Sequence, residues 1–149
     1  MKKTLWFLLT FLTIVSCIKV DNCDGILCFT PPQNFTFEMV DKISGENLYA
    51  NKTLDSLDII VLNEEGKNEK FNFISHNGLN LIDVPEIGWN TGLRQYKIIL
   101  NDTLSVNIQV NTEVVNKGCC TFYQTKSFQV LNYEYHQNDS LSYYVVKID

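Results

Sequence analysis

The sequence predicts an all-β protein, a single antiparallel β-sandwich of about seven to eight strands that follows a signal segment. From Phe35 onward, apolar and polar residues alternate with a period of two, which is typical of half-buried strands. The alternating runs are short, and breaks rich in Gly, Asn and Asp separate them. No segment of ten or more residues shows helical periodicity. A series of short strands of this kind favours two packed sheets.

The chain begins with an export signal. Lys2 and Lys3 form a charged start, an apolar run broken only by threonines covers Leu5 to Val15, and Ser16-Cys17 follows. This order of a basic region, an apolar region and a small residue indicates a cleaved signal. The apolar run is too short to span a bilayer, which needs about 20 apolar residues.

The last residues of the signal, Ile14-Val15-Ser16-Cys17, resemble the lipobox of bacterial lipoproteins. The resemblance implies that Cys17 becomes the mature N-terminus, with diacylglycerol on its sulfur and an acyl chain, such as palmitate, on its amine. Several chains anchor a protein firmly, whereas one gives only marginal binding. The alternative is an ordinary secretory signal that ends in Ser-Cys.

Three segments are therefore expected. Residues 1–16 are the lipoprotein signal peptide, residues 17–34 a lipidated tether, and residues 35–149 the β-sandwich domain. Polar residues, Gly25 and Pro31-Pro32 dominate the tether. Because the tether is short, we expect the lipid to hold the domain close to the membrane.

Four cysteines remain beyond Cys17: Cys23, Cys28, Cys119 and Cys120. In an exported chain, an even set of this kind predicts disulfides. A bridge between adjacent cysteines is strained, so we expect one or both bridges to join the N-terminal pair to the C-terminal pair. Each would close a loop of about ninety residues and contribute about 4 kcal/mol. A four-thiolate metal site is the alternative, but the adjacent pair lacks the usual ligand spacing.

The charge of the chain excludes one class of partner. Removal of residues 1–16 leaves ten basic against seventeen acidic residues, a formal charge of −7. A mildly acidic domain has no electrostatic footprint for nucleic acid. Its acidic residues are too dispersed to indicate a basic partner. About 130 residues make one domain of ordinary size.

The strands are expected in chain order. Phe35–Met39 alternates, and Asp58–Leu62 and Phe71–Phe73 flank a polar loop, so these two runs predict a hairpin. The clearest hairpin joins Tyr96–Leu100 to Leu104–Val110. Further apolar positions follow at Phe122, Phe128 and Val130, and a polar break covers residues 137–140. Residues 52–57 and 112–116 could each form one turn of helix at most.

The last strand, Leu141 to Ile148, is mainly apolar on both faces, which favours a central position in a sheet, with a buried helix as the alternative for so short a run. Tyr143, Val145 and Lys147 lie on one face, and Tyr144, Val146 and Ile148 on the other. The predicted core of the whole domain consists of Phe35, Phe37, Ile60, Phe71, Phe73, Leu81, Trp89, Tyr96, Ile98, Val106, Ile108, Phe128, Val145 and Ile148.

Two further resemblances concern fold and location. Asp41-Lys42-Ile43-Ser44-Gly45-Glu46-Asn47-Leu48 resembles the first turn of prealbumin-like and carboxypeptidase-regulatory-like sandwiches, with a tight turn at Ser44-Gly45 and a returning strand. The series of short strands predicts an immunoglobulin-like or transthyretin-like (prealbumin-like) outline, and the resemblance supports that fold. The whole chain resembles small envelope lipoproteins of Bacteroidota that carry this turn and a late Cys-Cys-Thr-Phe segment like Cys119–Phe122. That resemblance implies an envelope location and no activity.

No catalytic or metal-binding set is predicted, and no cofactor is expected. His76 follows a strand in Ser-His-Asn-Gly, which is typical of a turn, and His136 lies in a polar break. Glu64, Glu65 and Glu69 belong to a solvated hairpin loop, whereas paired glycosidase acids converge in a cleft. A calcium site of Asn51, Asp55 and Asp58 would match no EF-hand spacing.

Four residues are candidate sites of other kinds. Trp89, flanked by flexible residues, is either a core residue or an exposed ligand contact. Asp55-Ser56-Leu57, Asp102-Thr103-Leu104 and Asp139-Ser140-Leu141 resemble the O-glycosylation acceptor of Bacteroidota, which implies sugars on Ser56, Thr103 and Ser140. The alternative is that Asp-Ser and Asp-Thr are simply good turn residues.

These observations predict a non-enzymatic lipoprotein of the cell envelope, lipid-anchored in the outer membrane, with the periplasmic or surface face left open. Its partner is expected to be a protein or a glycan that binds loops of the sandwich, because function on rigid scaffolds usually resides in loops. The alternatives are an envelope hydrolase that uses His76 and a purely structural protein.

Overall fold

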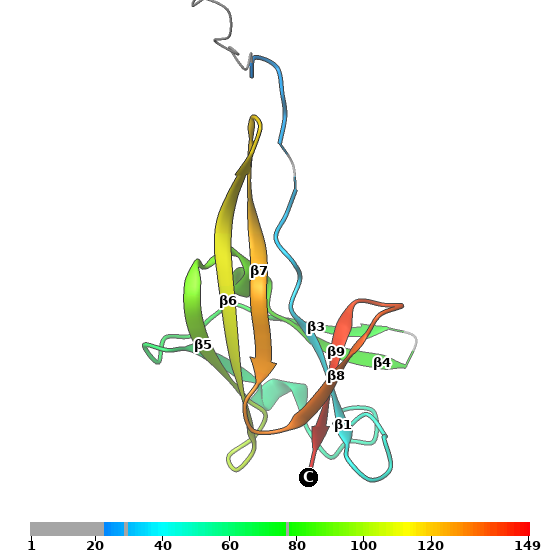
Figure 1. Ribbon diagram of the computed structural model, residues 1–149. Helices are drawn as coiled ribbons and strands as arrows, with labels where there is room; N and C mark the ends of the chain where they lie inside the picture. The colour runs from blue at the N-terminus through cyan, green and yellow to red at the C-terminus, as the bar shows by residue number, and fades with distance from the viewer. Residues whose placement is uncertain (1–22, 29, 77) are drawn as a thin grey trace, which may run out of the picture.

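The computed structural model describes residues 23–28, 30–76 and 78–149, so Cys17 and its predicted lipid lie outside the described residues. The described chain is all-β, as predicted, with nine strands and two short 3-10 helices (Figure 1). The strands are β1 (Thr36–Asp41), β2 (Ile60–Asn63), β3 (Asn72–His76), β4 (Leu79–Asp83), β5 (Gly92–Ile99), β6 (Ser105–Lys117), β7 (Cys120–Val130), β8 (Glu134–Asn138) and β9 (Tyr143–Ile148). The helices are η1 (Ser56–Asp58) and η2 (Pro85–Trp89).

The strands form two sheets that pack as a β-sandwich. Sheet A has the order β3-β4-β1-β9-β8, and sheet B has the order β2-β5-β6-β7. All neighbouring strands are antiparallel except β1 and β9, which are parallel. The first and last strands of the domain thus lie side by side in sheet A.

The core lies between the sheets, and alternation decides which residues enter it. Along β9, Tyr144, Val146 and Ile148 join the main core, while Tyr143 and Val145 join a second cluster on the other face of sheet A. This confirms the predicted two-faced character of the last strand, which lies between β1 and β8. The predicted core residues that are buried are Phe35, Phe37, Leu81, Tyr96, Ile98, Val106, Ile108, Val145 and Ile148.

Two predicted core residues are instead on the surface. Ile60 is 44% exposed because its neighbours Ile59 and Val61 point inward, so alternation along β2 turns Ile60 outward. Trp89 is 46% exposed at the end of η2. Phe71, Phe73 and Phe128 are partly buried against the core. The prediction of a core position was therefore wrong for the two exposed residues.

The hairpin predicted from Asp58–Leu62 and Phe71–Phe73 is not formed. β2 pairs with β5 in sheet B, whereas β3 pairs with β4 in sheet A. The polar segment 64–71 therefore leads from one sheet to the other. In the described chain, the segment after β2 pairs back with β2 through a single β-bridge, between Leu62 and Asn68. By contrast, the hairpin of β5 and β6 was predicted correctly.

The turn after β1 is built around one carboxylate. Asp41 Oδ1 accepts hydrogen bonds from the backbone N–H of Ile43 and Ser44, at 3.0 and 2.7 Å, and from the Ser44 hydroxyl at 2.9 Å. The two hydrogen bonds from Ser44 are the main reason that the pKa of Asp41 lies below its ordinary value. The predicted tight turn is present, with Gly45 at a φ of 74°. The returning chain makes one bridge, Val40 to Asn47, rather than a strand.

The hairpin of β6 and β7 is the longest element and extends beyond the sandwich (Figure 1). β5 accompanies β6 only as far as Thr112, which pairs with Gly92. Beyond Thr112, β6 has only β7 as a partner, from Glu113–Gln124 to Lys117–Cys120. Residues 112–116 thus belong to a strand, not to the turn of helix that the sequence allowed. We call the two-stranded part, residues 113–124, the distal hairpin.

Candidate functional site

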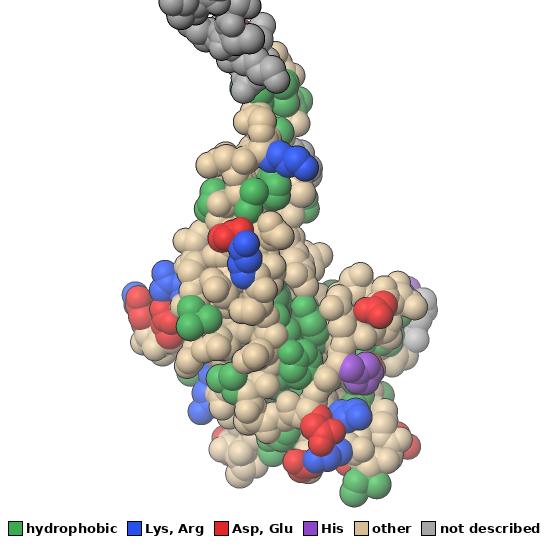
Figure 2. All heavy atoms as spheres, viewed as in Figure 1, with side chains coloured by type: hydrophobic (Ala, Val, Ile, Leu, Met, Phe, Trp, Pro, Cys, Tyr) green, Lys and Arg blue, Asp and Glu red, His purple; other side chains and the backbone are tan. Residues whose placement is uncertain are grey.

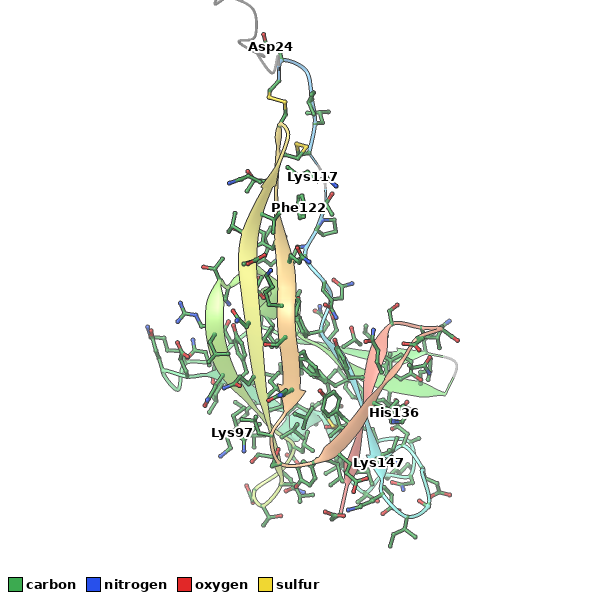
Figure 3. All side chains as sticks on the ribbon, viewed as in Figure 1. Asp24, Lys97, Lys117, Phe122, His136 and Lys147 are labelled. Atoms are coloured by element: carbon green, nitrogen blue, oxygen red, sulfur yellow. A yellow bond between two sulfur atoms is a disulfide. The ribbon has the colours of Figure 1, made fainter. Side chains whose placement is uncertain are left out.

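The N-terminal segment runs along the distal hairpin and is joined covalently to its tip. Disulfides link Cys23 to Cys119 and Cys28 to Cys120, each with a Cα–Cα distance of 5.4 Å (Figure 3). Both bridges run from the N-terminal pair to the C-terminal pair, as the sequence predicted. Cys119 and Cys120 follow Gly118 at the turn of the hairpin, so both links lie at its tip.

The other end of the N-terminal segment is seated on the sandwich. The backbone N–H of Val84 donates to the carbonyl oxygen of Phe35 at 3.0 Å. The side-chain amide of Gln33 donates to the Tyr144 hydroxyl at 2.6 Å, while burial of that hydroxyl raises the pKa of Tyr144. The segment is therefore held at both ends, at the hairpin tip and at the body.

Gly88 in η2 allows this seating. A Cβ atom added at Gly88 would lie 2.7 Å from the carbonyl oxygen of Gln33 and 2.8 Å from Cβ of Pro32. Any other residue would push the N-terminal segment away from η2, because backbone atoms cannot move aside as a flexible side chain does. The sequence Pro-Glu-Ile-Gly-Trp gave no sign of this contact, which joins residues far apart in the chain.

Trp89 lies where η2 meets the distal hairpin. Its ring packs edge-on against Tyr123 of β7, with the ring centroids 5.2 Å apart. About half of the indole remains exposed, so the contact with Tyr123 leaves part of the ring open to solvent. Trp89 itself lines none of the five described pockets, although its neighbour Asn90 lines one of them.

A groove of about 600 Å³ lies at the end of sheet B opposite to the hairpin tip. Its walls are η1, the outer face of β2 and β5, and the turn between β5 and β6. Leu57, Ile60 and Leu104 supply apolar surface, and Lys97 extends outward from β5 (Figure 3). Asp58 and Asp102 place carboxylates on two sides. We call this the β5 groove.

The sequence did not indicate the β5 groove. Its residues come from three segments, and each segment has an ordinary local pattern. The one available signal was the apolar pair Leu57 and Ile60. Both side chains are exposed, whereas the sequence pattern placed Ile60 in the core. An apolar residue on the outer face of a sheet can be recognised only after the inner face is known.

The two histidines do not converge. His76 ends β3 and His136 lies in β8, and these strands form opposite edges of sheet A. Both side chains are exposed. Three strands thus separate the two histidines, and Figure 3 labels His136 beside β8. The arrangement offers no pairing of one histidine with the other.

The acidic candidates are engaged in local contacts. Glu64 pairs with Arg94, Glu65 with Lys67 at 2.6 Å, and the Asn63 amide donates to Glu69 at 2.9 Å. These contacts fold the loop after β2, and the ion pair with Lys67 holds the pKa of Glu65 below its ordinary value. The loop is thus held by ion pairs, and Glu64, Glu65 and Glu69 line one small pocket together with Arg94.

The calcium candidates use their oxygens in the backbone turns around η1. Asn51 Oδ1 accepts from the N–H of Thr53, and Asp55 Oδ1 caps η1 by accepting from the N–H of Leu57. Within residues 23–28, 30–76 and 78–149, no group of three or more potential ligands is close enough to hold a metal ion.

The three glycosylation candidates lie in connections between strands. Ser56 begins η1 and is half-buried. Thr103 is exposed in the turn between β5 and β6, at the rim of the β5 groove, and Ser140 is exposed in the turn between β8 and β9. Two of the three residues are therefore exposed, although the Thr103 hydroxyl donates a hydrogen bond to Asn101 Oδ1 at 3.1 Å.

In the part of the chain that the structure describes, no helix is long and apolar enough to cross a membrane. Comparison of this chain with protein-family models, with curated proteins and with solved structures found no match.

Proposed function

We propose that this protein is a non-enzymatic lipoprotein of the outer membrane, anchored by lipid at Cys17, whose sandwich binds a protein or glycan partner through its loops. The proposal joins two features at opposite ends of the molecule. One is the N-terminal segment with its lipidation signal, and the other is the β5 groove.

The pair of disulfides is the observation that supports this arrangement best. Because the chain downstream of Cys17 is bonded to the hairpin tip, an anchor at Cys17 would act on the tip, not on the body. The turn between β5 and β6 and the connection through η1 then face away from the anchor (Figure 1). Loops held away from the membrane on a rigid scaffold are available to a partner.

The chemistry of the β5 groove suits a partner with both apolar and charged groups. Leu57 and Ile60 offer exposed apolar surface, while Lys97 provides a cation and Asp58 and Asp102 provide carboxylates in the same groove. The lining of the groove is more polar than apolar, which suits the polar surface of a glycan or a protein better than an apolar small molecule. We therefore assign the β5 groove as the contact surface.

The anchor is tested by Cys17→Ala, with Ser16→Ala as the matched control that keeps the modified cysteine. Wild type and the control are expected to partition into the detergent phase and to incorporate labelled palmitate. Cys17→Ala is expected to lose both properties, since no acyl chain can be attached. Detergent partitioning of Cys17→Ala at the wild-type level would show that the anchor is assigned wrongly.

The groove is tested by charge reversal at Lys97. The lipidated protein in micelles is screened on a glycan array and against purified envelope proteins, and the affinity for any partner found is then measured. Lys97→Glu is expected to weaken binding by about tenfold or more, the effect of losing one charge-assisted contact. Lys70→Glu makes the same charge change outside the groove and is expected to bind normally. Equal affinities for both variants would contradict the assignment.

Glycosylation at Ser56, Thr103 and Ser140 belongs to the same proposal. Thr103 and Ser140 are the stronger candidates because both are exposed. The intact mass of the native protein is expected to show hexose-sized increments, and Thr103→Val and Ser140→Ala are each expected to remove one modified site. A native mass equal to that of the unmodified lipoprotein would remove this part of the proposal.

A further inference from the structure

The tip of the molecule presents apolar side chains where the chain is otherwise polar. Leu27 is 94% exposed and Ile26 is 50% exposed. Both lie between the two cysteines of the N-terminal pair, so they belong to the tip that the disulfides define. In Figure 2, apolar side chains continue along the projecting hairpin as far as the described chain reaches.

The disulfides prevent these side chains from retreating into the protein. Residues 23–28 are closed into a small ring through Cys119 and Cys120, and the N–H of Ile26 donates to the carbonyl oxygen of Cys23 at 3.3 Å. The core lies at the other end of the hairpin, in the part of β6 that precedes Thr112 and pairs with β5. Leu27 is thus held in an exposed position by covalent bonds, which is a costly place for a large apolar side chain unless something covers it.

The position of the lipid indicates what covers it. Cys17 precedes Cys23 by six residues, which span at most about 21 Å when fully extended. Thr112 is the last residue of β6 that pairs with β5. The six residues from Glu113 to Gly118 span about 20 Å as a strand, so the tip lies about 20 Å from Thr112. A lipid at Cys17 therefore brings the tip to the bilayer and leaves the sandwich about a hairpin length away from it.

The charge at the tip favours an apolar contact over an electrostatic one. Among the described residues, the ring contains Asp24, and Lys117 stands just before the turn of the hairpin, so the formal charges of these two residues cancel (Figure 3). Lower on the hairpin, Lys126 pairs with Glu113 at 2.7 Å. A surface of this kind has no net attraction to anionic headgroups but can enter the apolar boundary of a neutral bilayer.

We infer that the disulfide-closed tip is a membrane-contact element, in which Ile26 and Leu27 enter the boundary between headgroups and acyl chains beside the lipid of Cys17. This inference rests on the proposed lipid anchor. It differs from the expectation that a short tether draws the domain onto the membrane, because the tip, not the body, makes the contact. The hairpin then acts as a spacer of fixed length.

The test uses the lipidated protein in vesicles of neutral phosphatidylcholine. In a Trp89→Phe background, the variant Leu27→Trp places one indole at the tip of the mature chain. The matched control is Ile43→Trp, because Ile43 is 96% exposed on the loop after β1, at the opposite end of the molecule. An interfacial residue lies about 5–10 Å into the boundary, so lipids brominated at shallow acyl positions quench an indole there.

The expected result is strong quenching and a shift to shorter emission wavelength for Leu27→Trp, with emission like that in water for Ile43→Trp. Vesicle flotation with water-like emission from both variants would overturn the tip contact while leaving the anchor intact. Protein that fails to float, and whose intact mass lacks the lipid, would overturn the proposed anchor and the tip contact together. Strong quenching of both variants would show that the body lies on the membrane, which also overturns the inference.

Discussion

The two halves of the β6–β7 hairpin are held in place by different forces. In the half that belongs to the sandwich, Val106, Ile108 and Val110 are fully or almost fully buried between the sheets. In the distal hairpin, Val114 is 45% exposed and, within the part of the chain that the structure describes, no third strand accompanies β6. A two-stranded hairpin alone is marginally stable in water. The comparison teaches that two disulfides and the N-terminal segment replace, at the tip, the apolar burial that stabilises the base.

The largest effect is expected from removal of both disulfides. In the chain-entropy model, a bridge that closes about 100 residues contributes about 4.7 kcal/mol. Once one bridge has formed, the second closes only the small ring of residues 23–28 and 119–120, which contributes roughly 2 to 3 kcal/mol. We therefore expect replacement of all four cysteines by serine to cost about 7 kcal/mol, measured by urea unfolding.

Single-pair variants sharpen this prediction. Cys23→Ser with Cys119→Ser, and Cys28→Ser with Cys120→Ser, are each expected to cost only roughly 2 to 3 kcal/mol, because the remaining bridge still closes the long loop. The two single-pair costs should therefore sum to less than the cost of the fourfold variant. If they summed to the full cost, the two bridges would act independently and the ring argument would fail.

The second effect contrasts burial in the two halves directly. Ile108→Ala is expected to cost about 2 to 5 kcal/mol, because it leaves a cavity in the core. Val114→Ala removes a half-exposed side chain six residues further along the same strand and is expected to change stability by about 0.5 kcal/mol or less. Urea unfolding of the disulfide-intact variants measures both. Similar costs for the two variants would mean that the distal hairpin is packed as tightly as the core.

The third effect concerns the contact between the N-terminal segment and η2. Gly88→Ala introduces a Cβ atom 2.7 Å from the carbonyl oxygen of Gln33, and overpacking of this kind costs about 1 to 3 kcal/mol. Amide hydrogen exchange is expected to increase at Val84, whose N–H donates to the Phe35 carbonyl where the segment joins the sandwich, while the disulfides keep the tip closed. Gln33→Ala, which loses only the hydrogen bond to Tyr144, is the milder control at about 1 kcal/mol. Unchanged exchange in Gly88→Ala would refute the close contact.

The smallest effect lies in the body, at the turn after β1. The pKa of Asp41 is lowered by its hydrogen bonds from Ser44, so the stabilisation it provides is present above the ordinary pKa of 3.8 and is lost as the pH falls through the lowered value. An NMR titration is expected to give Asp41 a midpoint below 3.8, and Ser44→Ala is expected to move it upward. Acid should loosen this turn without affecting the disulfide-closed tip. A midpoint at or above the ordinary value would contradict the turn geometry.

Local patterns were sufficient for some elements and not for others. The hairpin of β5 and β6 was predictable because its two strands are adjacent in the chain and separated by a short polar turn at Asn101-Asp102. The same local logic failed for β2 and β3, whose polar connection resembles a hairpin loop but leads to the other sheet. The outward position of Ile60 and the half-exposed position of Trp89 followed from the same missing information, namely which face of each element meets the core.

The candidate site was predictable only in part. The spacing of the four cysteines indicated bridges from one end of the chain to the other, since bonding within the adjacent pair is strained. The sequence left open which cysteine of each pair bonds to which, and it gave no sign of Gly88, of the exposed Leu27 or of the β5 groove. Each of these features depends on chain segments that are distant in sequence.

The sequence by itself determined the all-β class and the two-faced character of β9, because the alternation of side chains along a strand is a local steric property of the backbone. The tertiary structure decided which strands pair, that the β6–β7 hairpin projects beyond its sheet, and that the N-terminal segment is bonded to its tip. Strand partners are chosen by the sum of many non-local contacts, and each contact becomes favourable only after distant segments of the chain have come together.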